Sequence, residues 1–269
     1  MGTSTGYNMP TGGDWTPLKR DATRFVKGER ENGDSPNPVS PEALLRKYLI
    51  PQGGARSFAR GEAGTCGGST RGGNGSGGGG SGGRGGSGRA ARNTGRNLGG
   101  FLASVSSVGL DEALREVGLS HLVGQSAADV SAGLLDALAA PASTLDESAA
   151  RIALAKINDE MLKNAETYED VERALSDVLD NQGLVRTLMN FFSEYLYQLF
   201  CRDFYEGWKK VAPSQAERAL RNVKDCMTSA LKAKTVNRDV TKVKWHGREG
   251  LRITQQVMQE TLEIFEVTG

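Results

Sequence analysis

The chain has 269 residues, 38% of them hydrophobic, and a formal net charge of +1 at pH 7. It contains no run of about 18 apolar residues and no basic segment followed by an apolar one at its N-terminus, which excludes a recognisable membrane span or export signal. Its three cysteines form no close pair, so a disulfide framework and a zinc site are also excluded. We therefore expect a cytoplasmic protein that uses no metal and no cofactor.

The charge is divided unevenly along the chain. Residues 1–100 hold 14 Lys and Arg against 7 Asp and Glu, whereas residues 101–269 hold 19 against 25. This asymmetry favours either an acidic partner for the N-terminal part or contact between that part and the rest of the chain.

Residues 1–39 are predicted to form a flexible tail. Gly and Pro are scattered through this segment, and its large apolar residues are isolated: Tyr7, Trp15, Leu18 and Phe25. Such a segment buries too little apolar surface to offset the entropy that is lost on ordering.

Residues 40–50 are predicted to form one short helix. Ser40 is suited to the N-cap and Pro41 to the first helical position. The helix has an apolar face with Leu44, Leu45 and Tyr48 and no local partner for it. We expect this face to dock on the C-terminal part of the chain or on another protein, the alternative being a transient helix within a linker.

Residues 51–96 are predicted to form a Gly/Arg-rich tether. Residues 61–100 contain 19 glycines, and Gly/Ser-rich tracts behave as flexible coils. Arg-Gly-Gly steps at Arg71 and Arg84 could contact single-stranded RNA. No aromatic residues are interleaved with them, so nucleic-acid binding is the weaker interpretation and a plain linker the stronger one.

Residues 97–269 are predicted to form a compact all-α domain of about seven or eight helices, because apolar residues recur there at three-and-four spacing. Thr144 with Glu147 and Ser214 with Glu217 have the spacing of capping boxes. Residues 184–204 are apolar nearly all round, so this helix should be central to the bundle. Only residues 240–244 suggest a strand.

Groups for catalysis are scarce. The only histidines are His121 and His246, and the Gly-rich tract lacks the Gly-Lys-Ser/Thr ending of a phosphate-binding loop. We therefore expect no enzymatic activity in this chain alone. Trp208 and Trp245 are the aromatic residues most suited to lie near the surface of this domain, where either could anchor a protein partner, but a core or boundary position is the stronger interpretation for each.

The N-terminus offers a nucleophile. Methionine before glycine is normally removed, which would leave Gly2 with a free α-amine whose pKa is about 7.7–8.0. Myristoylation requires Ser or Thr at position 6, where this chain has Gly6. Another modification of Gly2 therefore stays open.

The sequence resembles the QatB family of the bacterial Qat anti-phage defence system. The segments that carry the resemblance keep their order along the chain and are Met1-Gly2-Thr3-Ser4-Thr5, Pro10-Thr11-Gly12-Gly13, Arg92-Asn93-Thr94-Gly95-Arg96-Asn97-Leu98-Gly99-Gly100-Phe101, Gly109-Leu110-Asp111-Glu112-Ala113-Leu114, Leu122-Val123-Gly124 and Ser143-Thr144-Leu145-Asp146-Glu147.

The resemblance implies a cytoplasmic, non-enzymatic component that acts with an ATPase, a QueC-like enzyme and a TatD-like nuclease. A QueC-like enzyme uses ATP to activate the carboxylate of a 7-deazaguanine for attack by an amine. We expect that amine to belong to Gly2, and Thr3 and Ser4 to be recognised by the modifying enzyme. The alternatives are a passive scaffold that bridges the ATPase and the nuclease, or an Arg-Gly protein that binds RNA.

Overall fold

The computed structural model describes residues 12–28, 39–61, 88–181, 183–235, 238 and 240–267. Every regular element within these ranges is a helix, which confirms the all-α fold class. The α-helices are α1 Trp15–Lys27, α2 Pro41–Leu49, α3 Gly54–Arg60, α4 Arg89–Val108, α5 Leu110–Glu116, α6 Ala127–Leu138, α7 Leu145–Met161, α8 Tyr168–Asn181, α9 Gly183–Val211, α10 Pro213–Ala233 and α11 Arg248–Val267. Short 3-10 helices occupy Ile50–Gln52 and Ser120–Leu122.

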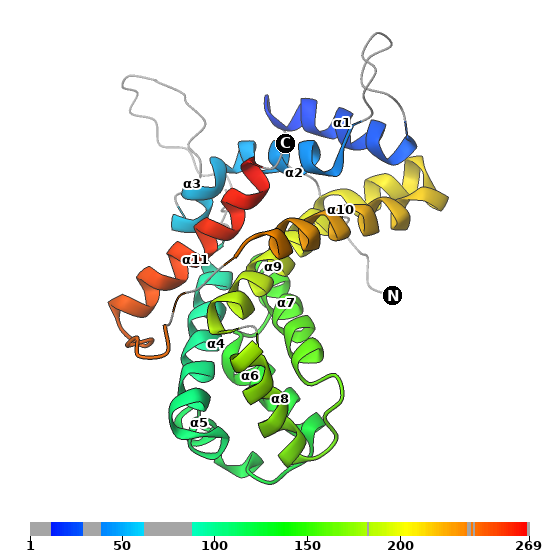
Figure 1. Cartoon of the computed structure of the whole chain (residues 1–269). Coiled ribbons are helices and arrows are strands. Elements are labelled where there is room, and N and C mark those ends of the chain that lie inside the picture. Colours follow the sequence, from blue (N-terminus) through cyan, green and yellow to red (C-terminus); the bar gives the residue numbers. More distant parts are fainter. Residues whose placement is uncertain are drawn as a thin grey trace, which may run out of the picture.

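The long helix α9 is the centre of the bundle, as its apolar composition predicts. It packs against α4, α7, α10 and α11 (Figure 1). Leu188, Met189, Phe192, Leu196 and Phe200 are all completely buried. Burying one such side chain contributes about 1.5–3 kcal/mol to stability, so this helix supplies a large part of the core.

Local capping signals place several helix starts correctly. The Ser40 hydroxyl accepts a hydrogen bond from the Ala43 amide at 3.2 Å, with Pro41 at the first helical position. Thr144 and Glu147 form the predicted capping box before α7. The box expected at Ser214 is absent, because α10 begins at Pro213 and no side chain caps it.

The N-terminal quarter of the chain is more helical than its composition suggests. Residues 15–27, expected to lie in a flexible tail, form α1, which buries Trp15, Leu18, Ala22 and Val26 along one face. The expected tether beginning at residue 51 instead contains α3, and α4 begins at Arg89 rather than at residue 97. Only residues 1–11, 29–38 and 62–87 of this region lie outside the described part.

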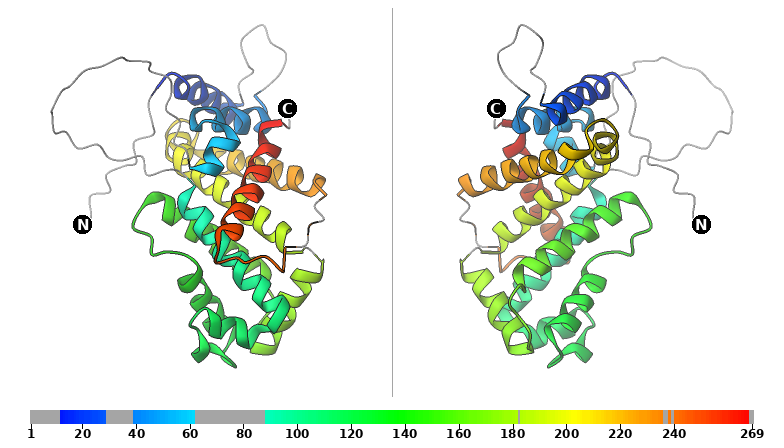
Figure 2. Two further views of the ribbon diagram at one scale, coloured as in Figure 1. Left: turned by 90° about the vertical axis from the view of Figure 1, so that its left-hand side faces the viewer. Right: turned by 90° about the vertical axis from the view of Figure 1, so that its right-hand side faces the viewer.

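The helices gather at two ends of the molecule. Figures 1 and 2 show α1, α2 and α3 together at one end, beside parts of α10 and α11, while α5, α6 and α8 lie at the opposite end. From residue 88 onward the described residues contain eight α-helices, in agreement with the expected number. None of the described helices has both the length and the apolar character to span a bilayer.

Candidate functional site

The predicted modification site itself, Gly2 with Thr3 and Ser4, lies outside the described residues. The description begins at Gly12, whose carbonyl accepts a hydrogen bond from the Thr16 amide at 3.3 Å at the start of α1. The geometry that bears on Gly2 is therefore the anchoring of α1, which carries the N-terminal segment.

Helix α1 is held by a buried charge as well as by its apolar face. Asp21 is only 3% exposed and lies 2.6 Å from the Lys47 ammonium of α2. Arg24 approaches the same carboxylate at 3.9 Å. Since a buried carboxylate that loses its partner is strongly destabilising, this ion pair fixes the position of α1 on α2.

Helix α2 docks on the chain's own core. Leu44, Leu45 and Tyr48 are at most 1% exposed, which supports the first of the expected alternatives and leaves no apolar face of α2 for a separate partner. The Tyr48 hydroxyl donates to the Asp203 carboxylate of α9 at 2.7 Å. The Tyr48 ring packs edge-on against Phe200, with the ring centroids 5.2 Å apart.

Trp208 is a core residue rather than a surface anchor. It is 2% exposed, and its ring lies 5.7 Å from the Phe25 ring of α1 and 5.8 Å from that of Phe204. The adjacent Lys209 and Lys210 are exposed, so these lysines and not the indole form the surface of α9 at this point.

Trp245 is buried too, at 4% exposure. Its indole N–H donates to the Val240 carbonyl at 3.2 Å, so the suggested strand at residues 240–244 is a turn folded under the ring. The ring lies on α4 at Gly99 and Gly100, where a Cβ on Gly99 would overlap it. Both tryptophans therefore stabilise the fold and leave no indole for a partner.

The two ends of segment 62–87 lie side by side. Arg92, near the start of α4, donates from its guanidinium to the carbonyls of Phe58 and Ala59 in α3, at 3.4 and 3.2 Å. Burial lowers the pKa of the Arg92 guanidinium, and the nearby Asp146 carboxylate opposes this shift. Arg92 thus joins the last helix before the segment to the first helix after it.

A second contact fixes the point where the chain re-enters the bundle. The Asp146 carboxylate accepts hydrogen bonds from the Gly88 and Ala90 amides at 3.2 and 3.0 Å, and from the Tyr195 hydroxyl. Complete burial, followed by the Asp146 charge, raises the pKa of Tyr195 well above its usual value. The chain therefore leaves the described part of the molecule at Gly61 and returns to it at Gly88, and both points are fixed by contacts of Arg92 and Asp146.

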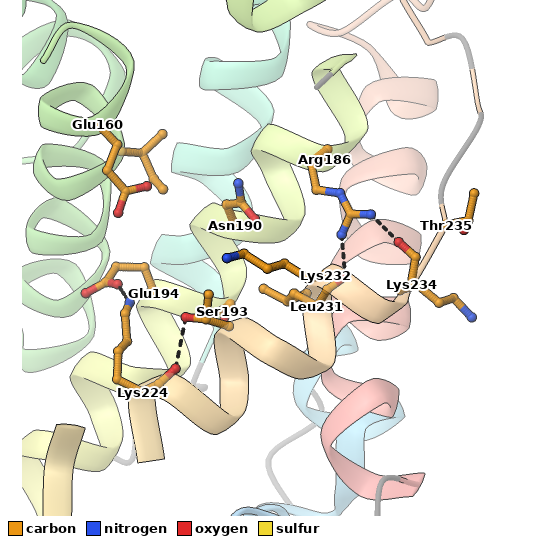
Figure 3. Close-up of a pocket in the computed structure, with 12 residues that line it drawn as sticks. Glu160, Arg186, Asn190, Ser193, Glu194, Lys224, Leu231, Lys232, Lys234 and Thr235 are labelled. Carbon is orange, nitrogen blue, oxygen red and sulfur yellow. Dashed lines mark hydrogen bonds and ion pairs between the residues drawn. The ribbon is translucent and has the colours of Figure 1, made fainter. Parts of the chain in front are cut away.

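A cleft lies between α7, α9 and α10 and has a volume of about 590 Å³ (Figure 3). The Glu194 carboxylate, almost fully buried, is ion-paired with Lys224 and accepts a hydrogen bond from Gln198 at 2.6 Å. The cleft's lining residues are Ile157, Glu160, Arg186, Asn190, Ser193, Glu194, Lys224, Thr228, Leu231, Lys232, Lys234 and Thr235. The sequence contains one signal for this cleft that the predicted site residues do not include, namely Glu194, a carboxylate inside the most apolar helix.

Metal-binding groups do not converge in the described ranges. No three His, Cys, Asp or Glu side chains come close enough there to hold a metal ion. The cysteines described, Cys201 and Cys226, are free thiols whose pKa values burial raises to about 11 and about 12. Raised pKa values keep these thiols protonated and unreactive near neutral pH.

Comparison with known proteins gives the family. A family model described as Qat anti-phage system associated protein QatB matches residues 79–265, which is most of the chain. The chain belongs to the QatB family. The QatB match covers α4 to α10 and nearly all of α11, whereas α1, α2 and α3 precede it. Neither the curated proteins nor the solved structures include a match to the chain.

Membership of the QatB family gives the chain a role in anti-phage defence. The other components of the Qat system are accordingly its candidate partners.

Proposed function

We propose that this chain is the protein substrate of the QueC-like component of the Qat system, which joins a 7-deazaguanine carboxylate to the Gly2 amine. ATP-dependent activation of the carboxylate would precede attack by the amine. The new bond is an amide, the activating group leaves with the carboxylate oxygen, and the amine loses a proton. The chain itself supplies the nucleophile and no catalytic group.

The family match and the anchoring of α1 together support this proposal. An α-amine with a pKa of about 7.7–8.0 is partly uncharged at cellular pH and is therefore a usable nucleophile. Gly2 has no Cβ, so a narrow active site can admit it. Thr3 and Ser4 would be read by the enzyme as the first side chains behind the acceptor.

The anchoring of α1 limits how far Gly2 can travel. Ten peptide units separate Gly2 from Gly12, where the description of the chain begins. A fully extended chain spans at most about 3.3–3.6 Å per residue, so Gly2 reaches no further than about 35 Å from Gly12. A QueC-like enzyme must therefore dock with its active site within that distance, close to the end of the molecule that carries α1, and not at an arbitrary distance on a long tether.

The deciding experiment is mass spectrometry of the full chain, expressed with and without the QueC-like component. Co-expression should add the mass of the deazaguanine acid less one water, and fragmentation should place the addition on Gly2. A matched variant, Lys19→Arg, keeps the charge of the first lysine while removing its amine, so it should still be modified. An unshifted mass in the presence of the active enzyme contradicts the proposal.

A short N-terminal deletion tests the passive-scaffold alternative. Removing residues 2–30 would also remove α1, which buries Trp15 and Leu18, and would damage the fold. Removing residues 2–13 spares α1, which begins at Trp15, and leaves Met1 before Asp14, so that no new N-terminal glycine is created. If the proposal holds, this shorter deletion abolishes defence while the chain still binds its partners, whereas a passive scaffold would retain full defence.

A further inference from the structure

The cleft between α7, α9 and α10 has the size of a small-molecule site. Its volume of about 590 Å³ falls within the range of roughly 300–1,000 Å³ that ligand pockets occupy. Buried Ile157 and Leu231 provide apolar surface in its lining. The buried Ser193 lies between the other two polar lining residues of this part of α9, Asn190 and Glu194. The site is distinct from Gly2 and from the residues that anchor α1.

Two polar groups in this cleft have no partner within the described ranges. Neither the Lys232 ammonium of α10 nor the Asn190 amide of α9 makes a hydrogen bond or ion pair there. In Figure 3 the Lys232 side chain extends across the cleft with its amine directed toward Asn190. A cation and an amide donor thus face the same space from two helices, an arrangement that suits a carboxylate or phosphate group.

At the C-terminus of α10, an arginine offsets the negative charge that would otherwise repel an anion. The carbonyls at the C-terminus of a helix carry partial negative charge. Here the Arg186 guanidinium of α9 donates to the Leu231 carbonyl at 2.6 Å and also to the Lys234 carbonyl (Figure 3). Because Arg186 binds these carbonyls, the exposed Lys232 ammonium is not held by the helix end and is available to a ligand at the cleft.

The opposite side of the cleft carries two carboxylates, Glu160 and Glu194, and the Lys224 ammonium. Glu194 is already paired with Lys224, whose ammonium also lies 4.9 Å from the centroid of the Tyr197 ring. Glu160, on α7, is exposed and makes no ion pair with any residue the structure describes. Its carboxylate can accept hydrogen bonds, so this side favours a ligand that carries N–H or O–H donors.

We infer that this cleft binds a nucleotide-sized small molecule with an anionic group at one end and hydrogen-bond donors at the other. The anionic group lies between Lys232 and Asn190, and the donors face Glu160. The inference does not depend on modification of Gly2, since no residue of the N-terminal segment takes part in it.

Calorimetric titration of the full-length chain tests the inference with three probes: AMP, inorganic pyrophosphate and citrate. AMP carries both a phosphate and an amino donor, while pyrophosphate and citrate separate the phosphate and carboxylate classes of anion. We expect saturable binding of one equivalent of AMP, weakened at least about tenfold by Lys232→Gln, the loss expected for one charge-assisted hydrogen bond. Arg221→Gln, an equal loss of charge at an exposed position of α10 outside the cleft, should leave the affinity unchanged.

The Glu160→Ala variant separates a ligand contact from a general electrostatic effect. It should weaken AMP, which loses the acceptor for its amino group, and should not weaken pyrophosphate, which gains from the removal of a nearby negative charge. The inference is overturned if none of the three probes binds. It is equally overturned if Lys232→Gln and Arg221→Gln have the same effect, or if Glu160→Ala weakens AMP and pyrophosphate alike.

Discussion

Replacing Tyr48 with Phe tests whether α2 is held in the core by the contact described here. The substitution deletes one oxygen atom and keeps the ring, including its edge-on packing against Trp15 and Phe200. The deleted hydroxyl donates to Asp203 at 2.7 Å, and the Asp203 side chain is 1% exposed. The variant therefore removes a hydrogen bond from a buried carboxylate and leaves the apolar packing unchanged.

The expected cost follows from the charge and burial of the acceptor. A hydrogen bond to a charged group contributes about 1.5–3 kcal/mol, and the Arg202 guanidinium, 2.8 Å from the other carboxylate oxygen, compensates only part of the loss. We expect Tyr48→Phe to lower the free energy of unfolding by about 2 kcal/mol.

Urea denaturation followed by circular dichroism measures this difference, and the chain contains a matched control. The Tyr168 hydroxyl donates to Asp111 at 2.6 Å at an exposed site, so Tyr168→Phe makes the same chemical change to the same kind of pair in solvent. Its cost should stay below about 1 kcal/mol, as for other exposed pairs. Equal costs for the two variants, or a neutral Tyr48→Phe, would refute the assignment of α2 to the core.

Two further predictions concern glycine positions in α4 and α9 and the half-buried thiols of Cys201 and Cys226. Gly99→Ala should lower the free energy of unfolding by about 1–3 kcal/mol in urea denaturation, because the new Cβ would overlap the Trp245 ring. Gly207→Ala should instead raise the free energy of unfolding by about 0.5–1 kcal/mol, because no atom lies close to the position of its Cβ. The pKa values of Cys201 and Cys226 are raised in the folded protein from the ordinary value of 9.0 to about 11 and about 12. As pH rises above about 9, the thiols ionise in the unfolded chain but stay protonated in the folded one, so the free energy of unfolding should fall. Their double replacement by Ala should reduce this slope by up to about 1.4 kcal/mol per pH unit for each thiol, and an unchanged slope would contradict the shifts.

Sequence signals that act within one helix were sufficient for much of the fold. The Thr144 capping box and the Ser40-Pro41 start depend on neighbours three residues away, and the structure has both. Helix α1 could not be predicted in this way, because its apolar stripe is stable only against α2, α9 and α10. Its Trp15 and Leu18 are separated from those partners by up to two hundred residues of sequence.

The position of Trp245 and the cleft show the same limit. The Trp245 indole is buried because Gly99 and Gly100 of α4 leave room for it, and no residue near Trp245 in the sequence indicates that this room exists. Lys232 and Asn190 line the same cleft because α9 packs on α10. They are far apart in the sequence, so no short sequence motif could have predicted a ligand site there. Gly2 could be named from the sequence because the proposed chemistry belongs to the terminal amine, and it stays a prediction because it lies outside the described residues.

The paired ends of segment 62–87 have a consequence for the covalent continuity of the molecule. Arg92 and the Asp146 cluster join the two flanks through side chains, and α3 packs on α11 independently of the intervening residues. Cutting the folded chain within that segment should therefore yield two fragments that remain associated. The cut would also leave the path from α1 to Gly2 unchanged, because that path lies entirely within the first fragment.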